Sequence, residues 1–268
     1  MSCVFLLGCA SNSGVEDLRK WMTPNGKVKV LCTIAMIEDL VKQVGGEYVD
    51  VLTLVRGELD PHSYQLVKGD DEKLVYAGII YYNGLGLEHG PSLRDYLIQS
   101  EKAVGLGNMI MKEYPELILH YNRSVDPHIW MDSKMWSMTI SHIVAKLAQF
   151  DPSHATIFQE NGDRVRQEMV RTHQQLREEM LRVPEKKRYL VTSHDAFNYF
   201  ARAYLATDGE IESGEWQKRF EAPEGLAPES QLSTTDLQLV IDHMRKYDVN
   251  VIFPESNVSQ ASIWKLVD

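Results

Sequence analysis

The sequence predicts an α/β protein with two lobes, each built on a mainly parallel sheet flanked by helices and joined by one long rigid helix. Apolar runs of strand length alternate with amphipathic helical segments before residue 150, and the alternation resumes after residue 186. Between these parts, residues 151–185 form one continuous helical pattern. About 30 helical residues rising 1.5 Å each give a rod roughly 45 Å long.

This pattern divides the chain into four parts. We expect a leader and tether over residues 1–25, an N-terminal lobe over 26–150, the linking helix over 151–185 and a C-terminal lobe over 186–268. The C-terminal lobe has fewer predicted strands than the first, so we expect it to be incomplete.

The N-terminal lobe contains three strong strand signals separated by helical patterns. The stretch "AMIEDLVKQVGG" has helical spacing and a double-glycine stop, and "LEHGPSLRDYLIQS" also has a helical pattern. "KAVGLG" has the composition of a short strand. The three main predicted strands are Lys27–Ile34, Val49–Val55 and Gly78–Gly84.

The second half begins with an amphipathic helical segment over Asp132–Phe150. The long helix follows, with Asp151 as its predicted cap and Pro152 in its first turn. Beyond it, "KRYLVTSHDAFNYFARAYL" predicts a strand, a turn that carries a histidine, and a helix. The remaining chain predicts a loop, a helix, a strand over Asn250–Phe253 and the start of another helix.

The composition restricts the kinds of molecule that this protein is expected to bind. The 268 residues carry a formal net charge of −10 and no basic cluster, which argues against nucleic acid as a partner. No run of about 18 apolar residues predicts a membrane-spanning helix. The three cysteines provide neither a disulfide framework nor a cysteine-based zinc site. We expect a monomer.

The N-terminus "MSCVFLLGCASNSG" resembles a bacterial lipoprotein signal. Leu6, Leu7 and Gly8 precede Cys9 as in a lipobox, although the apolar run is short and no basic residues precede it. We expect Cys9 to carry the lipid. The mature chain would then be periplasmic or otherwise extracytoplasmic, with a lipid anchor on that residue.

Two loops with the same motif suggest a metal site. "GELDPHSYQ" contains His62 and "SVDPHIWMD" contains His128, and each preceding proline stiffens its loop. A third histidine, His194, lies in "TSHD". Each of the three follows a predicted strand, at the edge where open α/β sheets bind ligands. Neutral imidazole suits zinc, manganese, iron, copper and nickel.

Acidic residues adjoin each of these histidines. Asp60, Asp126 and Asp195 are candidates to accept a hydrogen bond from the imidazole and so fix its tautomer. For any single histidine, the alternative is an ordinary loop or core residue. A nearby stretch, "GLGLEHG", lacks the spacing of a dinucleotide-binding loop. It predicts a strand-to-helix turn, with His89 as a surface residue rather than a further ligand.

Several stretches together resemble the metal-specific solute-binding lipoproteins of manganese, zinc and iron ABC importers, most closely the chlamydial and spirochaetal members. They are "TIAMIEDLVKQVGGEYVDVLTLV", "DPHSYQLVKGD", "YYNGLGLE", "DPHIWMD", "KRYLVTSHDAFNYFARAY", "GLAPESQLSTTDL" and "DVNVIFPES". The resemblance covers about residues 28–268.

This resemblance implies a function and a ligand set. A divalent transition metal, Mn, Zn or Fe, would be held in the cleft between the lobes and delivered to an ABC permease. His62 and His128 would come from the first lobe and His194 from the second. The family's fourth ligand is an aspartate in a segment like LYSD, which this sequence does not match, so we expect a C-terminally truncated chain. Glu255, in "FPES", is a candidate to support a histidine or to approach the metal.

Metal identity and competing functions stay open on the sequence alone. Zinc-specialised relatives often carry a histidine-rich loop after the third strand, whereas residues 90–124 contain only His120, which favours manganese or iron. The alternatives are a metal-dependent hydrolase and a surface adhesin with a structural metal. A hydrolase needs an open coordination position and a nearby base. H-x-H, HExxH and a paired acid and base are absent, so we expect no enzyme.

Overall fold

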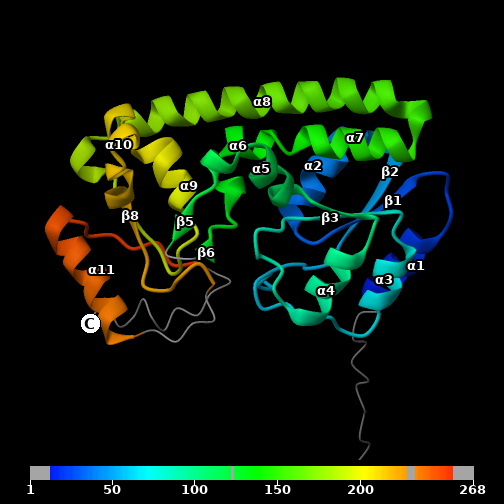
Figure 1. The fold of residues 1–268 in the computed structure, drawn as a ribbon, viewed down its shortest axis with the longest axis horizontal. Helices are drawn as coiled ribbons and strands as arrows, with labels where there is room; N and C mark the ends of the chain where they lie inside the picture. Colours follow the sequence, from blue (N-terminus) through cyan, green and yellow to red (C-terminus); the bar gives the residue numbers. More distant parts are fainter. Residues whose placement is uncertain (1–12, 122–123, 228–232, 256–268) are drawn as a thin grey trace, which may run out of the picture.

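The computed structural model describes residues 13–121, 124–227 and 233–255. It contains two lobes lying side by side, with helix α8 (Ala155–Arg182) running along both of them (Figure 1). The predicted α/β architecture with two lobes and one long linking helix is confirmed. Within the described residues, no helix combines the length and apolar character needed to cross a membrane.

The sheet of the N-terminal lobe has four parallel strands. They are β1 (Val28–Cys32), β2 (Val49–Thr53), β3 (Ile79–Tyr82) and β4 (Ala103–Gly105), in the order β2-β1-β3-β4. Val30, in the middle of β1, pairs with Val51 on one side and Ile79 on the other. Every residue of β1 is buried, as expected for a central parallel strand. All four carboxyl ends therefore lie at one edge.

Alternate residues of β1 face two different apolar layers. The helices beside the sheet are α1 (Ser13–Met22), α2 (Ala35–Gly45), α3 (Asp70–Tyr76), α4 (Pro91–Gln99), α5 (Leu106–Glu113) and α7 (Ile140–Phe150). Val30 and Cys32 pack in the layer that contains α2, α5, α7 and the first half of α8, whereas Leu31 packs on the side of α1, α3 and α4. The sheet is thus covered on both faces.

Helix α1 changes the expected lobe boundary. Trp21 is only 3% exposed, and its Nε1 donates a hydrogen bond to the backbone oxygen of Asp50 at 2.8 Å. The expectation that residues 1–25 form a tether outside the fold is therefore wrong for this helix, because its end packs on the N-terminal lobe. Cys9 lies outside the described residues.

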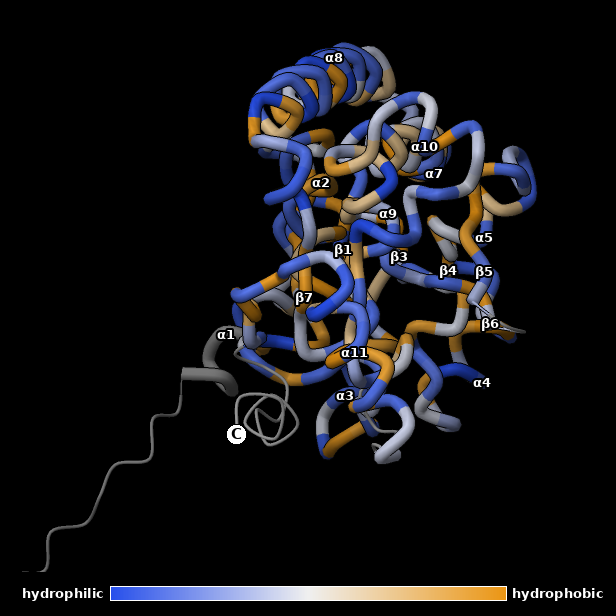
Figure 2. The backbone as a smooth tube through the Cα atoms, turned by 90° about the vertical axis from the view of Figure 1, so that its left-hand side faces the viewer, coloured by the Kyte–Doolittle hydropathy of each residue, from blue (hydrophilic) through white to orange (hydrophobic). Residues whose placement is uncertain are grey.

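Helix α8 is closely packed at its beginning and more exposed beyond it. Its buried residues, Phe158, Gly162 and Val165, all lie in the first half, against the N-terminal lobe. The backbone of Gly162 approaches α7 so closely that a Cβ there would lie 2.5 Å from Cγ2 of Val144. Hydrophilic residues predominate along the rest of the helix (Figure 2).

The far end of α8 is attached to the C-terminal lobe by polar contacts. Nη1 of Arg177 donates to the backbone oxygen of Ala203 at 2.6 Å, and Nη2 contacts Asp208 Oδ1 at the same distance. The helix ends at Arg182, just before Pro184, which restricts the preceding residue to extended conformations.

The C-terminal lobe has little sheet among the described residues. β7 (Leu190–Val191) pairs in parallel with β8 (Phe220–Glu221), and single bridges join Thr192 to Phe253 and His194 to Glu224. The strand expected over Asn250–Phe253 is thus reduced to one bridge. The helices of this lobe are α9 (Asn198–Phe200), the π-helix η6 (Ala201–Leu205), α10 (Asp208–Ser213) and α11 (Thr234–Tyr247).

Short elements connect the lobes and complete the chain. The antiparallel pair β5 (His120–Tyr121) and β6 (Ser124–Val125) precedes the second DPH loop, and α6 (Ser133–Ser137) follows it. The 3₁₀ turns are η1 (Gly46–Tyr48), η2 (Pro115–Leu117), η3 (Ile129–Met131), η4 (Pro152–His154), η5 (Glu185–Lys187) and η7 (Glu215–Arg219).

Candidate metal centre

His62 is presented by the loop that follows β2. Oδ1 of Asp60 accepts the backbone N–H of His62 at 2.9 Å, and Oδ2 accepts the hydroxyl of Ser63 at 2.8 Å. Pro61 lies between them and fixes its own φ. Asp60 therefore shapes the loop through the backbone of His62 and the hydroxyl of Ser63, and His62 is only 4% exposed.

His128 is held by its own aspartate. Oδ1 of Asp126 accepts the backbone N–H of His128 at 2.9 Å and lies 2.8 Å from the ring nitrogen Nδ1. The amide of Asn83, at the end of β3, donates to the backbone oxygen of Pro127 at 3.0 Å. The second DPH loop is thus fixed against the carboxyl edge of the sheet, although it arrives from the β5–β6 hairpin.

His194 comes from the C-terminal lobe, just after β7. Its Nδ1 lies 2.8 Å from Oε2 of Glu255, a close contact without the alignment of a good hydrogen bond. Oε1 of Glu255 accepts the backbone N–H of His194 at 3.2 Å. The hydroxyl of Ser193 accepts the backbone N–H of Glu255 at 3.1 Å. Glu255 therefore supports His194 from behind.

The three imidazoles converge in a buried group. One nitrogen from each of His62, His128 and His194 lies within 4.8 Å of the others, an arrangement that could hold a metal ion. Nε2 of His62 and Nε2 of His128 are 3.2 Å apart. The ring centroids are separated by 5.2, 5.4 and 6.1 Å. Because Asp126 and Glu255 occupy the Nδ1 sides of two rings, the opposite nitrogens are directed to the centre.

Burial keeps His62 neutral. Desolvation, with repulsion from the neighbouring histidines, lowers the pKa of His62 to about 2. A neutral imidazole retains the lone pair that a metal requires, so protons compete poorly for this ring.

Glu88 is a buried support of the site. Its carboxylate is buried and accepts hydrogen bonds from the hydroxyl of Thr33 at 2.6 Å, the backbone N–H of Asn83 at 2.8 Å and that of Gly84 at 2.9 Å. Burial raises its pKa, against the effect of these donors. Glu88 thereby ties together the ends of β1 and β3 that face the histidines.

Asp195 does not contact the ring of His194. Its Oδ1 accepts the amide of Asn198 at 2.5 Å, and the same amide donates to Asp126 Oδ2 at 3.0 Å. Burial, reinforced by the charge of Asp126, raises the pKa of Asp195 to about 7. Asn198, a residue that the sequence pattern did not single out, therefore connects the aspartate behind His128 to the C-terminal lobe.

Two cavities reach the histidine group. One, of about 270 Å³, is lined by all three histidines and by Glu255. The other, of about 780 Å³, includes His62 and also His89. The ring centroids of His62 and His89 are 5.9 Å apart, and His89 is half-buried. His89 thus lies beside the candidate metal centre, while its ring stays outside the group of converging nitrogens.

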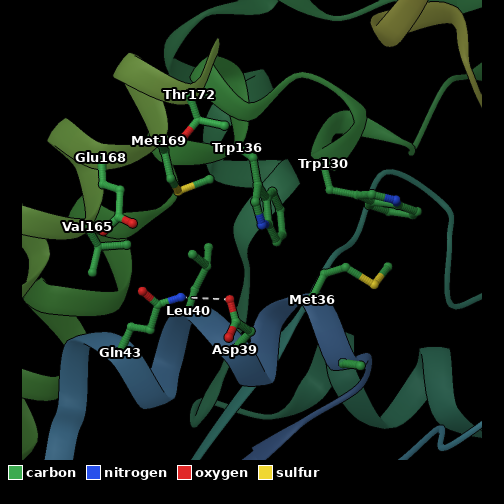
Figure 3. A pocket seen from close by; sticks show the side chains of 11 residues that line it. Met36, Asp39, Leu40, Gln43, Trp130, Trp136, Val165, Glu168, Met169 and Thr172 are labelled. Carbon is green, nitrogen blue, oxygen red and sulfur yellow. Dashed lines mark hydrogen bonds between the residues drawn. The ribbon is translucent and has the colours of Figure 1, made fainter. Parts of the chain in front are cut away.

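A third cavity, of about 510 Å³, lies between α2 and α8 and contains none of the histidines. Met36, Trp130 and Trp136 line it (Figure 3). Trp130 separates this space from the metal centre, because its ring packs edge-on against His128 with centroids 5.3 Å apart. Asp39 and Gln43 form a hydrogen bond at its rim (Figure 3).

The arrangement favours binding over bond cleavage. Among the described residues, the group with metal-binding geometry consists of three histidines and no carboxylate. The nearest described acidic groups, Asp126 and Glu255, contact the Nδ1 side of the rings rather than the centre. A metal-dependent hydrolase requires a base beside the metal-bound water, and neither carboxylate is in that position.

Known proteins share both the sequence and the fold. Residues 30–268 match the family described as ZnuA, zinc-uptake complex component A, periplasmic. The metal-binding protein YtgA of Chlamydia trachomatis serovar D is 37% identical over 265 residues, covering 99% of this chain and 79% of that protein. The manganese-binding lipoprotein MntA of Bacillus subtilis is 28% identical over 267 residues, covering 98% of this chain and 80% of that protein.

Solved structures agree with this relationship. The crystal structure of Fe(III)-bound YtgA from Chlamydia trachomatis superposes with a TM-score of 0.87 at 39% identity, covering 90% of this chain and 85% of that one. The periplasmic zinc-binding protein TroA from Treponema pallidum gives a TM-score of 0.79 at 29% identity, covering 90% and 82%. The chain therefore belongs to the ZnuA family of metal-binding solute-binding proteins.

Proposed function

We propose that this protein captures a divalent transition metal between its lobes and delivers it to an ABC permease. The observation that carries the proposal is the convergence of three buried imidazoles from both lobes on one point. Relatives named for manganese, zinc and iron binding support the same class of cargo. No bond is made or broken in this function, which consists of binding, transfer and release.

In this proposal the ligands are His62, His128 and His194. Asp126 and Glu255 orient two of the rings from their Nδ1 sides, at 2.8 Å in each case. Such supporting carboxylates increase the basicity of the ligand and fix its tautomer. Asp60 contributes by holding the loop of His62, whereas Asp195 acts through Asn198 rather than on a ligand.

Capture depends on the relative position of the lobes. His62 and His128 belong to the N-terminal lobe and His194 to the C-terminal lobe, so complete coordination requires both lobes in place. Helix α8 is packed against the first lobe and attached to the second through Arg177. We infer that metal exchange proceeds through a small adjustment of the lobes around this stiff connection.

The chemistry of the group leaves three metals as candidates. Imidazole nitrogens accept zinc, manganese and iron, and the general affinity order places zinc above manganese and ferrous iron. Zinc is therefore expected to bind readily in solution whichever metal is the biological cargo. The absence of a histidine-rich stretch between residues 90 and 124 of the sequence favours manganese or iron as that cargo.

Location and assembly follow from the same proposal. A protein that supplies an importer acts outside the cytoplasm, and several relatives are named as lipoproteins. We propose that Cys9 anchors the chain through a lipid and that the protein acts as a monomer.

Calorimetric titration of the metal-stripped full chain with Mn²⁺ and Zn²⁺ tests this proposal. We expect binding at one site, and a loss of at least about 100-fold in affinity in His128→Ala. His120→Ala is the matched control, since His120 is an exposed histidine on β5 outside the group. Saturation at about 100 times the dissociation constant should add about 2.7 kcal/mol of stability. Failure of the folded chain to bind either ion, or equal binding by His128→Ala, would contradict the proposal.

A further inference from the structure

His89 occupies a fixed position beside the histidine group. It lies in the tight turn between β3 and α4, where the backbone N–H of Leu87 donates to the oxygen of Gly84 and that of His89 donates to the oxygen of Leu87, both at 3.0 Å. The neighbouring Glu88 is buried and anchors the start of the turn through the N–H groups of Asn83 and Gly84. Nδ1 of His89 lies 3.3 Å from the backbone oxygen of Gly86.

The cavities place His89 on a route to the centre. His89 and His62 both line the cavity of about 780 Å³, which lies between the turn and the C-terminal lobe residues Gly225 and Leu226. His62 also lines the smaller cavity, together with His128 and His194. His62 is therefore the histidine common to both spaces.

The spacing of the rings would allow an ion to be shared between His89 and His62. Their centroids are 5.9 Å apart, which falls within the range of 5.2 to 6.1 Å found among the three rings of the group. A zinc–nitrogen distance of about 2.0–2.1 Å brings two ligating rings to a separation of this order. His89 nevertheless lies outside the group whose nitrogens meet at one point.

We propose that His89 is an entry ligand, which receives the metal ion in the larger cavity and passes it to His62. The inference rests on the proposed metal-binding function and adds a route to it. A strongly hydrated cation must exchange its waters for protein ligands before it reaches a buried site. A first imidazole at the entrance allows this exchange to proceed stepwise, with the ion held by at least one nitrogen throughout.

This role has a kinetic signature. A residue that contacts the ion only in transit lowers the barrier in both directions, so its loss slows association and dissociation alike and leaves the dissociation constant unchanged. Most substitutions at a binding site act differently, because they change mainly the dissociation rate. The two rates together therefore distinguish an entry ligand from a resident one.

The test is stopped-flow measurement of zinc binding and release by the full chain, using a fluorescent zinc indicator for uptake and excess chelator for release. We expect His89→Ala to slow both rates by about tenfold, equivalent to about 1.4 kcal/mol of barrier, with the dissociation constant within about twofold of the original. His89→Gln, which keeps a polar side chain in the turn, should behave in the same way. His89→Cys should recover much of the rate, because a thiolate also binds zinc.

His120→Ala is the matched control. Nδ1 of His120 also lies 3.3 Å from a nearby backbone oxygen, that of Ile118, but this histidine lines a different cavity. Unchanged rates in both His89→Ala and His89→Gln would overturn the inference. Faster release with unchanged uptake would also overturn it, because His89 would then be a resident ligand. If the unsubstituted chain binds no zinc, the proposed function fails first, and this inference fails with it.

Discussion

Asp126 links a candidate metal ligand to the opposite lobe. Its Oδ1 lies 2.8 Å from Nδ1 of His128, while its Oδ2 accepts a hydrogen bond from the amide of Asn198 at 3.0 Å. His128 belongs to the N-terminal lobe, and Asn198 begins α9 of the C-terminal lobe. One carboxylate thus orients a candidate ligand and also forms a hydrogen bond with the neighbouring lobe.

Replacing Asp126 should weaken metal binding. In Asp126→Asn the ring of His128 loses its ionised partner and becomes less basic, so we expect zinc affinity to fall by about 10–100-fold. Calorimetric titration measures the change. Asp60→Asn is the matched control, because Asp60 contacts the backbone of His62 and the hydroxyl of Ser63 instead of a ligand ring. Equal losses in the two variants would show that loop shape matters more than the carboxylate behind His128.

Replacing Glu88 should reduce the stability of the N-terminal lobe. In Glu88→Gln, one oxygen that now accepts a hydrogen bond becomes an NH₂ group facing a buried donor from Thr33, Asn83 or Gly84. An unsatisfied buried group costs about 1–3 kcal/mol, which urea unfolding of the metal-free protein would detect. Glu58→Gln alters an exposed glutamate nearby and should leave stability unchanged. A similar stability for Glu88→Gln would argue against this network.

Asp195 should make the metal-free protein less stable as the pH rises. Its pKa of about 7 in the folded state is raised above the ordinary aspartate value, so the folded chain binds more protons and loses stability from about pH 4 to pH 7. Asp195→Asn removes this dependence of stability on pH. We expect the variant to be more stable by about 2–4 kcal/mol at pH 8, with the advantage disappearing near pH 4.

His62 should have the opposite effect on how the free energy of unfolding changes with pH. Its pKa of about 2 in the folded state is below the ordinary histidine value, so its contribution to stability is lost as the pH falls below about 6.5. In the unsubstituted protein the two groups oppose each other between about pH 4 and 6.5. Urea unfolding at several pH values should therefore show a steeper acid loss in Asp195→Asn. A constant difference between the two proteins at every pH would contradict the assignment of Asp195, and no loss of stability below about pH 6.5 in Asp195→Asn would contradict that of His62.

The contact between α7 and α8 should not tolerate a larger residue. In Gly162→Ala, the added Cβ would lie 2.5 Å from Cγ2 of Val144, so the valine side chain or the helices must shift. We expect a loss of about 1–3 kcal/mol from overpacking, partly offset by the better helix propensity of alanine. Gly209→Ala is the control, because α10 leaves open space at that Cβ. Thermal unfolding compares the two, and a stabilised Gly162→Ala would contradict the close approach.

The sequence predicted the three strands β1 to β3, the long helix and the three histidines, because these features depend on local patterns. Apolar runs of strand length and rigid DPH loops are visible without knowledge of distant contacts. The packing of Trp21 and the position of His89 depend on residues far away in the chain, so no local pattern could reveal them.

The acidic residues beside the histidines also show how far local sequence can predict a contact. Asp126 is two residues before His128, on the same side of an extended segment, and its side chain reaches the ring. Asp195 directly follows His194, so its side chain points to the other side and meets Asn198. Glu255 lies beside His194 instead. The backbone bridge between Thr192 and Phe253, which are far apart in the sequence, brings the two residues together.

Helix α8 is packed tightly at only one end. Phe158, Gly162 and Val165 hold it against the N-terminal lobe, and its other end contacts the C-terminal lobe through Arg177. The part of the helix beyond Val165 spans about 26 Å, so a tilt of about 1° displaces the far end by about 0.4 Å. Metal–ligand distances in protein sites lie within about 0.2 Å of their standard values. A bend of a degree or two is therefore large enough to alter the coordination that His194 offers. The contact of Asp126 with Asn198 resists such a bend, so the binding of the ion depends on this contact as well as on the angular stiffness of the helix.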